Sequence, residues 1–204
     1  PRDAVGENTF PLVTSKDFFE GNINFNSAKK ISEADHIEIS RRSLVEVDDI
    51  LFSMIGGNIG NQVMVKDSRP FSIKNVALFK YYNKVFTIPN YFKIYTEHLA
   101  LTLQNEASGG AQPFVALGSL RKLIFALPPL PEQHRIVAKV DELMTLCDTL
   151  KTTLQKGPTP SSTLLKQARA IGLSQRTLNR ARHQLKVSCY YDQPSNQWLS
   201  ALPP

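Results

Sequence analysis

Residues 127–151 read LPPLPEQHRIVAKVDELMTLCDTLK, a proline-rich stretch followed directly by a helix-forming one. A narrow stripe of apolar residues recurs along it at alternating gaps of four and three: Ile136, Val140, Leu143, Cys147, Leu150 and Leu154. This heptad rhythm keeps the stripe, here called the seam, on one side of a helix, and a narrow stripe suits packing against another helix. We predict a coiled-coil-like helix over residues 132–156 with the seam as its pairing surface. The alternative is an ordinary amphipathic helix packed on its own domain.

The composition of the whole chain is that of a globular protein. Of its 204 residues, 42% are hydrophobic and 21% are charged. No apolar run approaches the roughly 18 residues that a membrane span needs, and two cysteines provide neither a disulfide framework nor a zinc-binding spacing. We therefore expect a cytoplasmic protein with no membrane partner and no metal site.

The net charge of +6 is concentrated near the C-terminus. Residues 157–204 contain six lysines and arginines against one acidic residue, Asp192, whereas residues 1–156 contain 18 against 17. This asymmetry favours a polyanionic partner for the tail.

The region before the proline-rich stretch mixes short strand-like runs with turns. A glycine-rich loop at residues 56–60 separates two such runs, and a second glycine-bearing loop occupies residues 107–113. Pro89 opens a helical pattern, since proline suits a first helical turn. We predict an α+β domain with a curved mixed β-sheet and a few helices. Its predicted strands are at residues 43–47, 50–55, 62–65, 73–81 and 114–117.

Three stretches of the chain carry a resemblance to a known family. They are DDILFS with IGGNIG (residues 48–60), ASGGAQ (residues 107–112) and LPPLPEQ (residues 127–133). Their order and spacing resemble the specificity subunit of Type I restriction–modification systems, over residues 1 to about 155. The resemblance implies a target-recognition domain at residues 1–127 and a proline brace with a conserved spacer helix at residues 128–156.

The resemblance also implies a function and a set of partners. In that family, two recognition domains each read half of a split double-stranded DNA target, and paired antiparallel helices hold them apart. The partners would be modification (methyltransferase) subunits, which carry S-adenosylmethionine, and a restriction/translocase subunit. No cofactor is expected on this chain itself.

This sequence departs from the family in the number of its parts. A complete specificity subunit has two recognition domains and two spacer helices, and this sequence contains one of each. Two half-size chains could pair head to tail as a homodimer and rebuild a two-domain reader. Alternatively, the chain is a truncated remnant.

DNA recognition needs groups that read base edges and groups that bind phosphates. The two glycine loops combine close backbone approach with an amide, which can bond adenine bidentately; the alternative is that both are merely tight turns. The candidate base readers are Gly56, Gly57, Asn58, Ser108, Gly109, Gly110 and Gln112. Phosphate contacts are expected from basic side chains, although surface charge for solubility explains them equally well. They are Lys29, Lys30, Arg41, Arg42, Lys74, Arg121 and Lys122.

The tail carries a second, separate signal. After a linker at residues 157–163, residues 164–204 are predicted to form a helix-turn-helix followed by a small β-wing. The wing would pair residues 189–191 with residues 197–199. The exposed face of the second helix presents Gln175, Arg176, Asn179, Arg180, Arg182 and His183, which suit phosphates and base edges. The segment is similar to a C-terminal winged-helix element of phage- or plasmid-type primase and replication proteins.

Catalysis is the function that the sequence supports least. It contains neither the cofactor loop nor the Asn/Asp-Pro-Pro-Tyr/Phe tetrapeptide of a methyltransferase, and no Walker, G-x-S-x-G or H-E-x-x-H motif. We expect a non-catalytic DNA-specificity subunit. The alternatives are a replication- or mobile-element-associated protein that binds DNA through its tail, and a non-functional remnant.

Overall fold

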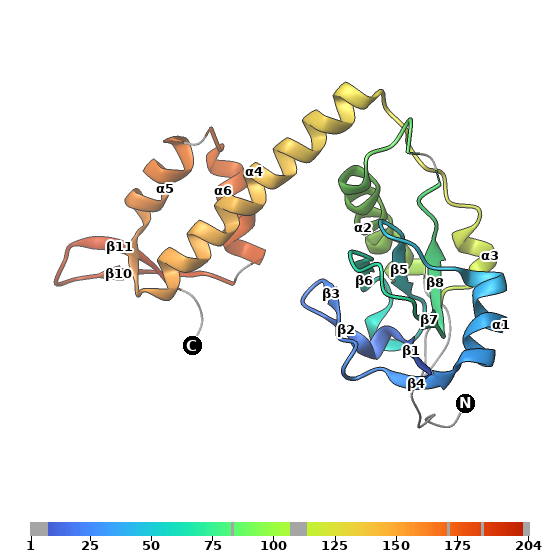
Figure 1. Ribbon diagram of the computed structural model, residues 1–204. Coiled ribbons are helices and arrows are strands. Elements are labelled where there is room, and N and C mark those ends of the chain that lie inside the picture. The colour runs from blue at the N-terminus through green and yellow to red at the C-terminus, as the bar shows by residue number, and fades with distance from the viewer. Residues whose placement is uncertain (1–7, 83, 107–113, 171, 185, 202–204) are drawn as a thin grey trace. The chain divides into compact units, whose positions relative to one another are not determined.

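The computed structural model describes residues 8–82, 84–106, 114–170, 172–184 and 186–201 (Figure 1). The chain divides into two compact units, Pro1–Val137 and Ala138–Pro204, called here the first and second units. The boundary falls inside helix α4 (Leu130–Gln155), not at an end of the predicted spacer segment. None of the described helices combines the length and the apolar character needed to span a membrane.

The first unit mixes strands and helices, which confirms the α+β class, but its strands do not form one curved sheet. They form two three-stranded sheets, with orders β4-β1-β7 and β6-β5-β8, and a two-stranded hairpin. Strand β1 pairs antiparallel with β4 and parallel with β7, whereas the second sheet is antiparallel throughout. The strands are β1 Thr9–Val13, β2 Phe18–Phe19, β3 Asn22–Ile23, β4 Lys29–Ser32, β5 Ile50–Ser53, β6 Gln62–Met64, β7 Ser72–Ile73 and β8 Val76–Phe79.

The prediction of one strand over residues 73–81 is wrong, and the break explains why there are two sheets. Strand β7 ends at Ile73 and pairs with β1, while β8 begins at Val76 and pairs with β5. Between them, Asn75 has a φ of 58°. Asparagine is one of the few residues that tolerate this left-handed conformation. The left-handed residue Asn75 therefore lets one apolar run contribute strands to two different sheets.

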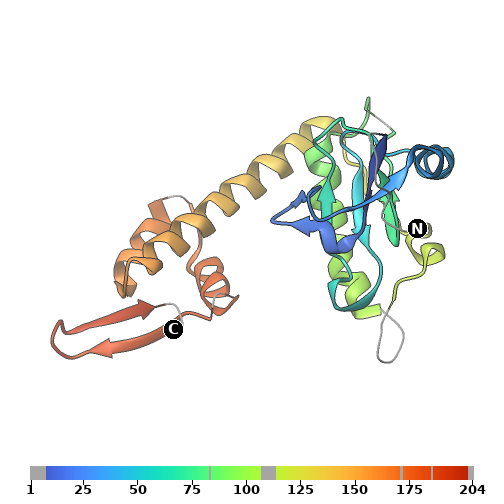
Figure 2. The same cartoon turned by 60° about the horizontal axis from the view of Figure 1, so that its bottom comes forward.

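Strand β5 is buried on both faces because layers cover it on each side. Leu51 belongs to a core cluster with Val13 and Ile73 of the first sheet, so this cluster lies between the two sheets. The next residue, Phe52, points the opposite way and packs with Leu103 of helix α2 (Pro89–Glu106). Helix α1 (Glu33–Ser43) contacts the first sheet. The two helices accordingly lie on opposite sides of the strands (Figures 1 and 2).

Helix α1 was not predicted, and the strand predicted at residues 43–47 is wrong. The Ser32 hydroxyl caps the helix by accepting a hydrogen bond from the backbone N–H of Asp35 at 3.2 Å. The helix ends at Ser43, and the alternating residues after it form an irregular segment. The backbone N–H of Glu46 donates to the buried carboxylate of Asp49 at 2.8 Å. A side chain therefore holds this segment in place, and not the backbone hydrogen bonds of a paired strand.

The remaining described elements of the first unit are short. They are the 3₁₀ turns η1 (Ser15–Asp17) and η2 (Gly56–Asn58) and the short helix α3 (Leu117–Leu120). The strand predicted at residues 114–117 is reduced to a single bridge between Ile55 and Phe114.

Helix α4 spans Leu130–Gln155, with Pro131 in its first turn, so the predicted stretch is helical. It ends before Gly157, whose φ of 129° lies in the region that favours glycine.

The second unit contains the rest of helix α4, a short sheet and two more helices. Its elements are β9 Thr159–Pro160, α5 Ser161–Ala170, α6 Gln175–Gln184, β10 Ser188–Asp192 and β11 Gln197–Ala201. Strands β10 and β11 form the predicted hairpin, and β9 pairs antiparallel with β11. Part of the predicted linker is therefore structured, because it contains β9 and the start of α5.

The core of the second unit uses part of the seam. Leu154 is buried and Leu143 is half-buried, and both pack with residues of α5 and α6 such as Leu164 and Leu178. For these two residues the alternative interpretation, an amphipathic helix packed on its own domain, is therefore correct. Ile136, Val140 and Cys147 are half-buried, and the side chain of Leu150 lies outside the described residues.

Candidate nucleic-acid interface

A hollow of about 710 Å³ lies in the first unit, and we call it the basic hollow. Its walls come from four places: the end of β1 with η1, the start of β4, the turn η2, and the crossing between β7 and β8. Five residues predicted from the sequence line it, namely Lys29, Gly56, Gly57, Asn58 and Lys74. Strand pairing and the crossing at Asn75 bring them together from distant parts of the chain.

The rim of the basic hollow is positively charged. Lys16, Lys29 and Lys74 line it and are exposed. The one acidic residue of the lining, Asp17, is only 5% exposed. Its carboxylate accepts hydrogen bonds from the Thr14 N–H at 2.8 Å, the Thr14 hydroxyl at 2.9 Å and the Ser27 hydroxyl at 2.7 Å. Asp17 thus stabilises the wall of the hollow, and the lysines define its outward charge.

Turn η2 offers an open backbone beside an exposed amide. Gly56 has a φ of 74°, so the tight-turn interpretation accounts for this glycine. It does not account for Gly57, where an added Cβ would meet nothing within 4 Å. Asn58 and Asn75 are exposed on the same lining, and such amides can bond adenine bidentately. This combination suits reading a base edge from close range.

Other predicted contacts are not part of this hollow. Strand alternation turns Lys30 away from the face of Lys29. Arg41 and Arg42 lie in the last turn of α1, where Arg42 is 4.0 Å from Glu38. Arg121 and Lys122 are exposed just after α3. The loop residues Ser108, Gly109, Gly110 and Gln112 lie outside the described residues.

Sequence reasoning missed Lys16 and Asn75. Neither belongs to a motif, and both reach the hollow only through the paths that the chain takes around β1 and β7. Their only sequence signal was their residue type, a lysine and an asparagine near predicted turns.

The LPPLPEQ stretch contains a buried polar anchor, Gln133, whose side chain is 0% exposed. Its Oε1 accepts a hydrogen bond from the Ile88 N–H at 3.0 Å, and its Nε2 donates to the carbonyls of Phe86 at 2.6 Å and Pro128 at 2.8 Å. Gln133 therefore holds the first turns of helix α4 and the proline brace against the unit that carries the basic hollow.

A second buried anchor joins strand β5 to the segment after β8. Asp49, 1% exposed, accepts from the Tyr81 N–H at 2.9 Å and from the Lys80 ammonium at 2.8 Å. Although burial of the Lys80 ammonium opposes its charge, the hydrogen bonds to Asp49 and Glu46 raise the pKa of Lys80 above its ordinary value. The hydrogen bond from Lys80 lowers the pKa of Glu46. This arrangement stabilises the unit by joining β5 to the segment after β8.

Over the part of the chain that the structure describes, no three His, Cys, Asp or Glu side chains gather so as to hold a metal ion.

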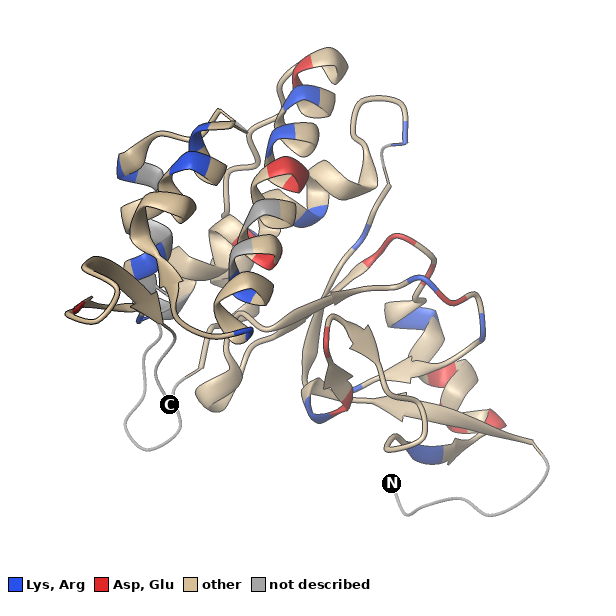
Figure 3. Ribbon diagram, turned by 90° about the vertical axis from the view of Figure 1, so that its left-hand side faces the viewer, with Lys and Arg blue, Asp and Glu red and all other residues tan. Residues whose placement is uncertain are grey.

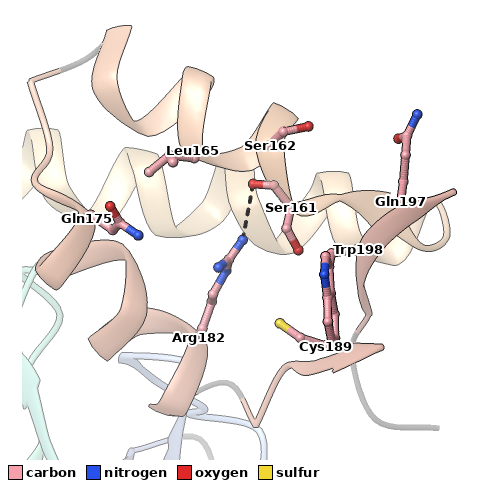
Figure 4. A pocket seen from close by; sticks show the side chains of 8 residues that line it. All are labelled: Ser161, Ser162, Leu165, Gln175, Arg182, Cys189, Gln197 and Trp198. Carbon is pink, nitrogen blue, oxygen red and sulfur yellow. Dashed lines mark hydrogen bonds between the residues drawn. The ribbon is translucent and has the colours of Figure 1, made fainter. Parts of the chain in front are cut away.

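The second unit contains a hollow of another kind, called here the aromatic hollow (Figure 4). Its volume is about 450 Å³, and its lining comes from α5, α6 and the β10–β11 hairpin. The lining residues are Ser161, Ser162, Leu165, Gln175, Arg182, Cys189, Gln197 and Trp198.

Of the predicted tail contacts, Gln175 and Arg182 line the aromatic hollow. Arg176 and Asn179 are exposed on α6 outside that lining, and the side chain of Arg180 lies outside the described residues. Beyond helix α4, the one acidic residue is Asp192 at the end of β10, whereas basic residues occur on both α5 and α6 (Figure 3).

One of the comparisons with known proteins shows a family, and another shows a similar fold. A family model described as the type I restriction modification DNA specificity domain matches residues 7–157. A chain from a structure on complex assembly and conformational transition of the type I R-M system is similar in fold, with a TM-score of 0.54 and 20% sequence identity. That match covers 86% of this chain and 38% of the other. A comparison with curated proteins gave no match.

Proposed function

The chain belongs to the family of type I restriction modification DNA specificity domains, and we propose that it reads double-stranded DNA through the basic hollow of its first unit. The observation that carries this proposal is the gathering of Lys29, Lys74 and turn η2 around one hollow. Residues chosen separately for phosphate and base contacts line the same hollow. The lysines would bind phosphates and set the register, and Asn58, with Asn75 beside it, would read base edges.

The partners follow from the family as proposals. A modification subunit would carry S-adenosylmethionine and transfer the methyl group, and a restriction/translocase subunit would join for cleavage. The chain itself would contribute recognition without catalysis. The Gln133 anchor supports this division of roles, because it makes the start of helix α4 a firm extension of the recognition unit.

A half-size subunit would pair with a second copy through the seam. Leu143 and Leu154 already pack within the second unit, so pairing would use the preceding part of helix α4, around Ile136 and Val140. Light scattering of the chain copurified with a modification subunit tests this proposal. A complex with two copies of each supports the half-size subunit, and a monomer that ignores the modification subunit contradicts it.

Selection from a pool of random DNA duplexes, with the full chain and its modification subunit, would test recognition directly. Asn58→Ala should relax the selected sequence at one position, at a cost of about 1–3 kcal/mol of discrimination. Lys74→Ala should weaken binding to all sequences alike and reduce the salt dependence by about one phosphate contact. Lys84→Ala, which changes an exposed lysine of the first unit outside the hollow, is the matched control. If Asn58→Ala selects the same sequence as the unchanged protein, turn η2 does not read bases.

A second candidate function rests on the second unit. Arg176 and Asn179 are exposed on α6, and the order helix, strand, two helices and hairpin is that of a winged helix. A tail-driven binder would lose most of its duplex affinity in the double variant Arg176→Ala/Asn179→Ala and keep it in Lys74→Ala. This pair of variants is sharper than deleting residues 157–204, because the deletion would uncover Leu154 and Leu143.

A further inference from the structure

The hairpin of the second unit exposes aromatic rings that its small core does not use. Trp198 is 60% exposed, Tyr191 46% and Tyr190 42%. Tyr191 lies directly opposite Trp198, with ring centroids 5.6 Å apart at 63°, so both rings are on one face of the hairpin. Tyr190 is on the other face. Ring pairing stabilises a hairpin, but it leaves much of the indole of Trp198 open on the aromatic hollow.

Arg182 lines the same hollow and has one hydrogen-bond donor atom that is not satisfied. Its Nη2 donates to the carbonyl of Ser161 at a long 3.4 Å, and its Nε is buried with no hydrogen-bond partner among the described residues. A buried donor atom without an acceptor is costly, and the half-buried Arg182 would gain from an acceptor that enters the hollow. No acidic side chain is part of the lining, so an anionic ligand would meet no repulsion there.

The two features face each other across the hollow. Arg182 and Gln175 project from α6, and Trp198 and Cys189 come from the hairpin (Figure 4). A flat aromatic face beside a guanidinium matches a nucleotide, which has a stacking base and an anionic phosphate. The volume of about 450 Å³ lies within the range of ligand sites.

We propose that the aromatic hollow binds an unpaired nucleotide of single-stranded DNA, with the base stacked on Trp198 and the phosphate paired with Arg182. A duplex fits less well, because its bases already cover each other's faces and offer none to the indole. This site goes beyond the reading of double-stranded DNA by the first unit and does not depend on it. It is also distinct from the exposed α6 residues Arg176 and Asn179.

The chain contains its own reporter, because Trp198 is its only tryptophan. The full chain would be titrated with a thymidine oligonucleotide, with the same strand in a duplex, and with heparin as a polyanion that has no bases. The proposal expects saturable quenching of Trp198 emission by the single strand at a concentration at least tenfold lower than for the duplex. Equal or stronger quenching by the duplex, or no quenching by either, overturns it.

Labelled-oligonucleotide anisotropy separates stacking from charge. Trp198→Ala should weaken single-strand binding about tenfold, since one stacked base contributes on that scale, while Trp198→Phe should keep most of it and exclude misfolding as the cause. Tyr190→Ala, an aromatic residue on the other face of the hairpin, is the matched control and should stay within twofold. Equal losses for Trp198→Ala and Tyr190→Ala would overturn the site.

Two further variants complete the test. Arg182→Gln should weaken binding and lower its salt dependence by about one phosphate. Asn58→Ala, in the first unit, should leave single-strand binding unchanged, so a failure of duplex recognition and a failure of this site would be distinguishable. A salt dependence unchanged by Arg182→Gln would contradict the phosphate contact.

Discussion

Both units of this chain have an apolar core, but the first unit adds buried polar side chains to it. The first unit buries Asp17, Asp49 and Gln133, each satisfied by several hydrogen bonds to segments without regular structure. The second unit has an aliphatic core of residues such as Leu154, Leu164 and Leu178. Polar anchors occur where the chain must hold irregular walls and crossings. Burial of a leucine cluster suffices where regular helices meet.

The two hollows differ in the same way. The basic hollow collects lysines and amides from four separated segments, whereas the aromatic hollow is made by two adjacent helices and one hairpin. The first therefore depends on tertiary anchors for its shape. The second depends mainly on local elements, so the effects of substitutions in the two units should be separable.

The largest effect is expected in the core of the second unit. Leu164 is 0% exposed, and Leu164→Ala should lower the free energy of unfolding of this unit by about 3 to 4 kcal/mol, through lost burial and a cavity. Urea unfolding followed by Trp198 fluorescence reports on this unit alone. Lys166→Ala, two residues further along the same helix and exposed, should have little effect. A fluorescence transition that does not move would show that the leucine cluster is not the main support.

Breaking the buried ion pair should have the next largest effect, in the first unit. Lys80→Met leaves the Asp49 carboxylate buried without its cation and should destabilise by about 3 kcal/mol, the low end for such pairs, because the Lys80 side chain is 15% exposed. Circular dichroism should detect the shift while the Trp198 transition stays in place. Lys84→Met, an exposed lysine nearby, is the control. Equal shifts for the two variants would contradict a structural role for the pair.

Gln133→Leu should have a smaller effect on the first unit. It removes three hydrogen bonds and leaves the Ile88 N–H and two carbonyls unpaired, at a cost of about 2 kcal/mol. Hydrogen exchange should rise at Ile88 and in the first turn of α4. Gln155→Leu, an exposed glutamine in the same helix, should leave exchange at both places unchanged. Similar hydrogen exchange in the two variants would show that Gln133 does not anchor the start of helix α4.

The smallest and most gradual effect is expected from alkaline pH. Hydrogen bonding raises the pKa of Lys80 against the opposing effect of burial, and burial raises the pKa of Tyr81 and Tyr91. A raised folded-state pKa gives stability that is complete below the unfolded values of 10.5 and 10.0 and is lost as the pH rises through the folded values. The urea midpoint of the first unit should therefore be flat near neutrality and fall above about pH 10. A midpoint that stays flat above that pH would contradict these shifts.

The acid side of the same cluster has the opposite sign. The pKa of Glu46 is lowered by Lys80, so its contribution is present above the ordinary value of 4.5 and is lost as the pH falls through the folded value. Lys80→Met should remove this acid dependence and the lysine part of the alkaline dependence together.

Local patterns in the sequence determined the elements that repeat within a short window. The heptad spacing predicted helix α4, the Pro89 pattern predicted helix α2, and the turn between two aromatic runs predicted the β10–β11 hairpin. Each has a period or a turn signal that is independent of the rest of the chain. The family was also accessible, because its three stretches are read in order along the chain.

Only the tertiary structure decided which segments meet. Contacts between distant residues divide residues 73–81 between two sheets and pack Leu143 and Leu154 on α5 and α6. Such contacts also bring Lys16 and Asn75 to the basic hollow. Such contacts leave no local period. A leucine in a heptad looks the same whether its partner is a second chain or its own tail, and only the packed core distinguishes the two.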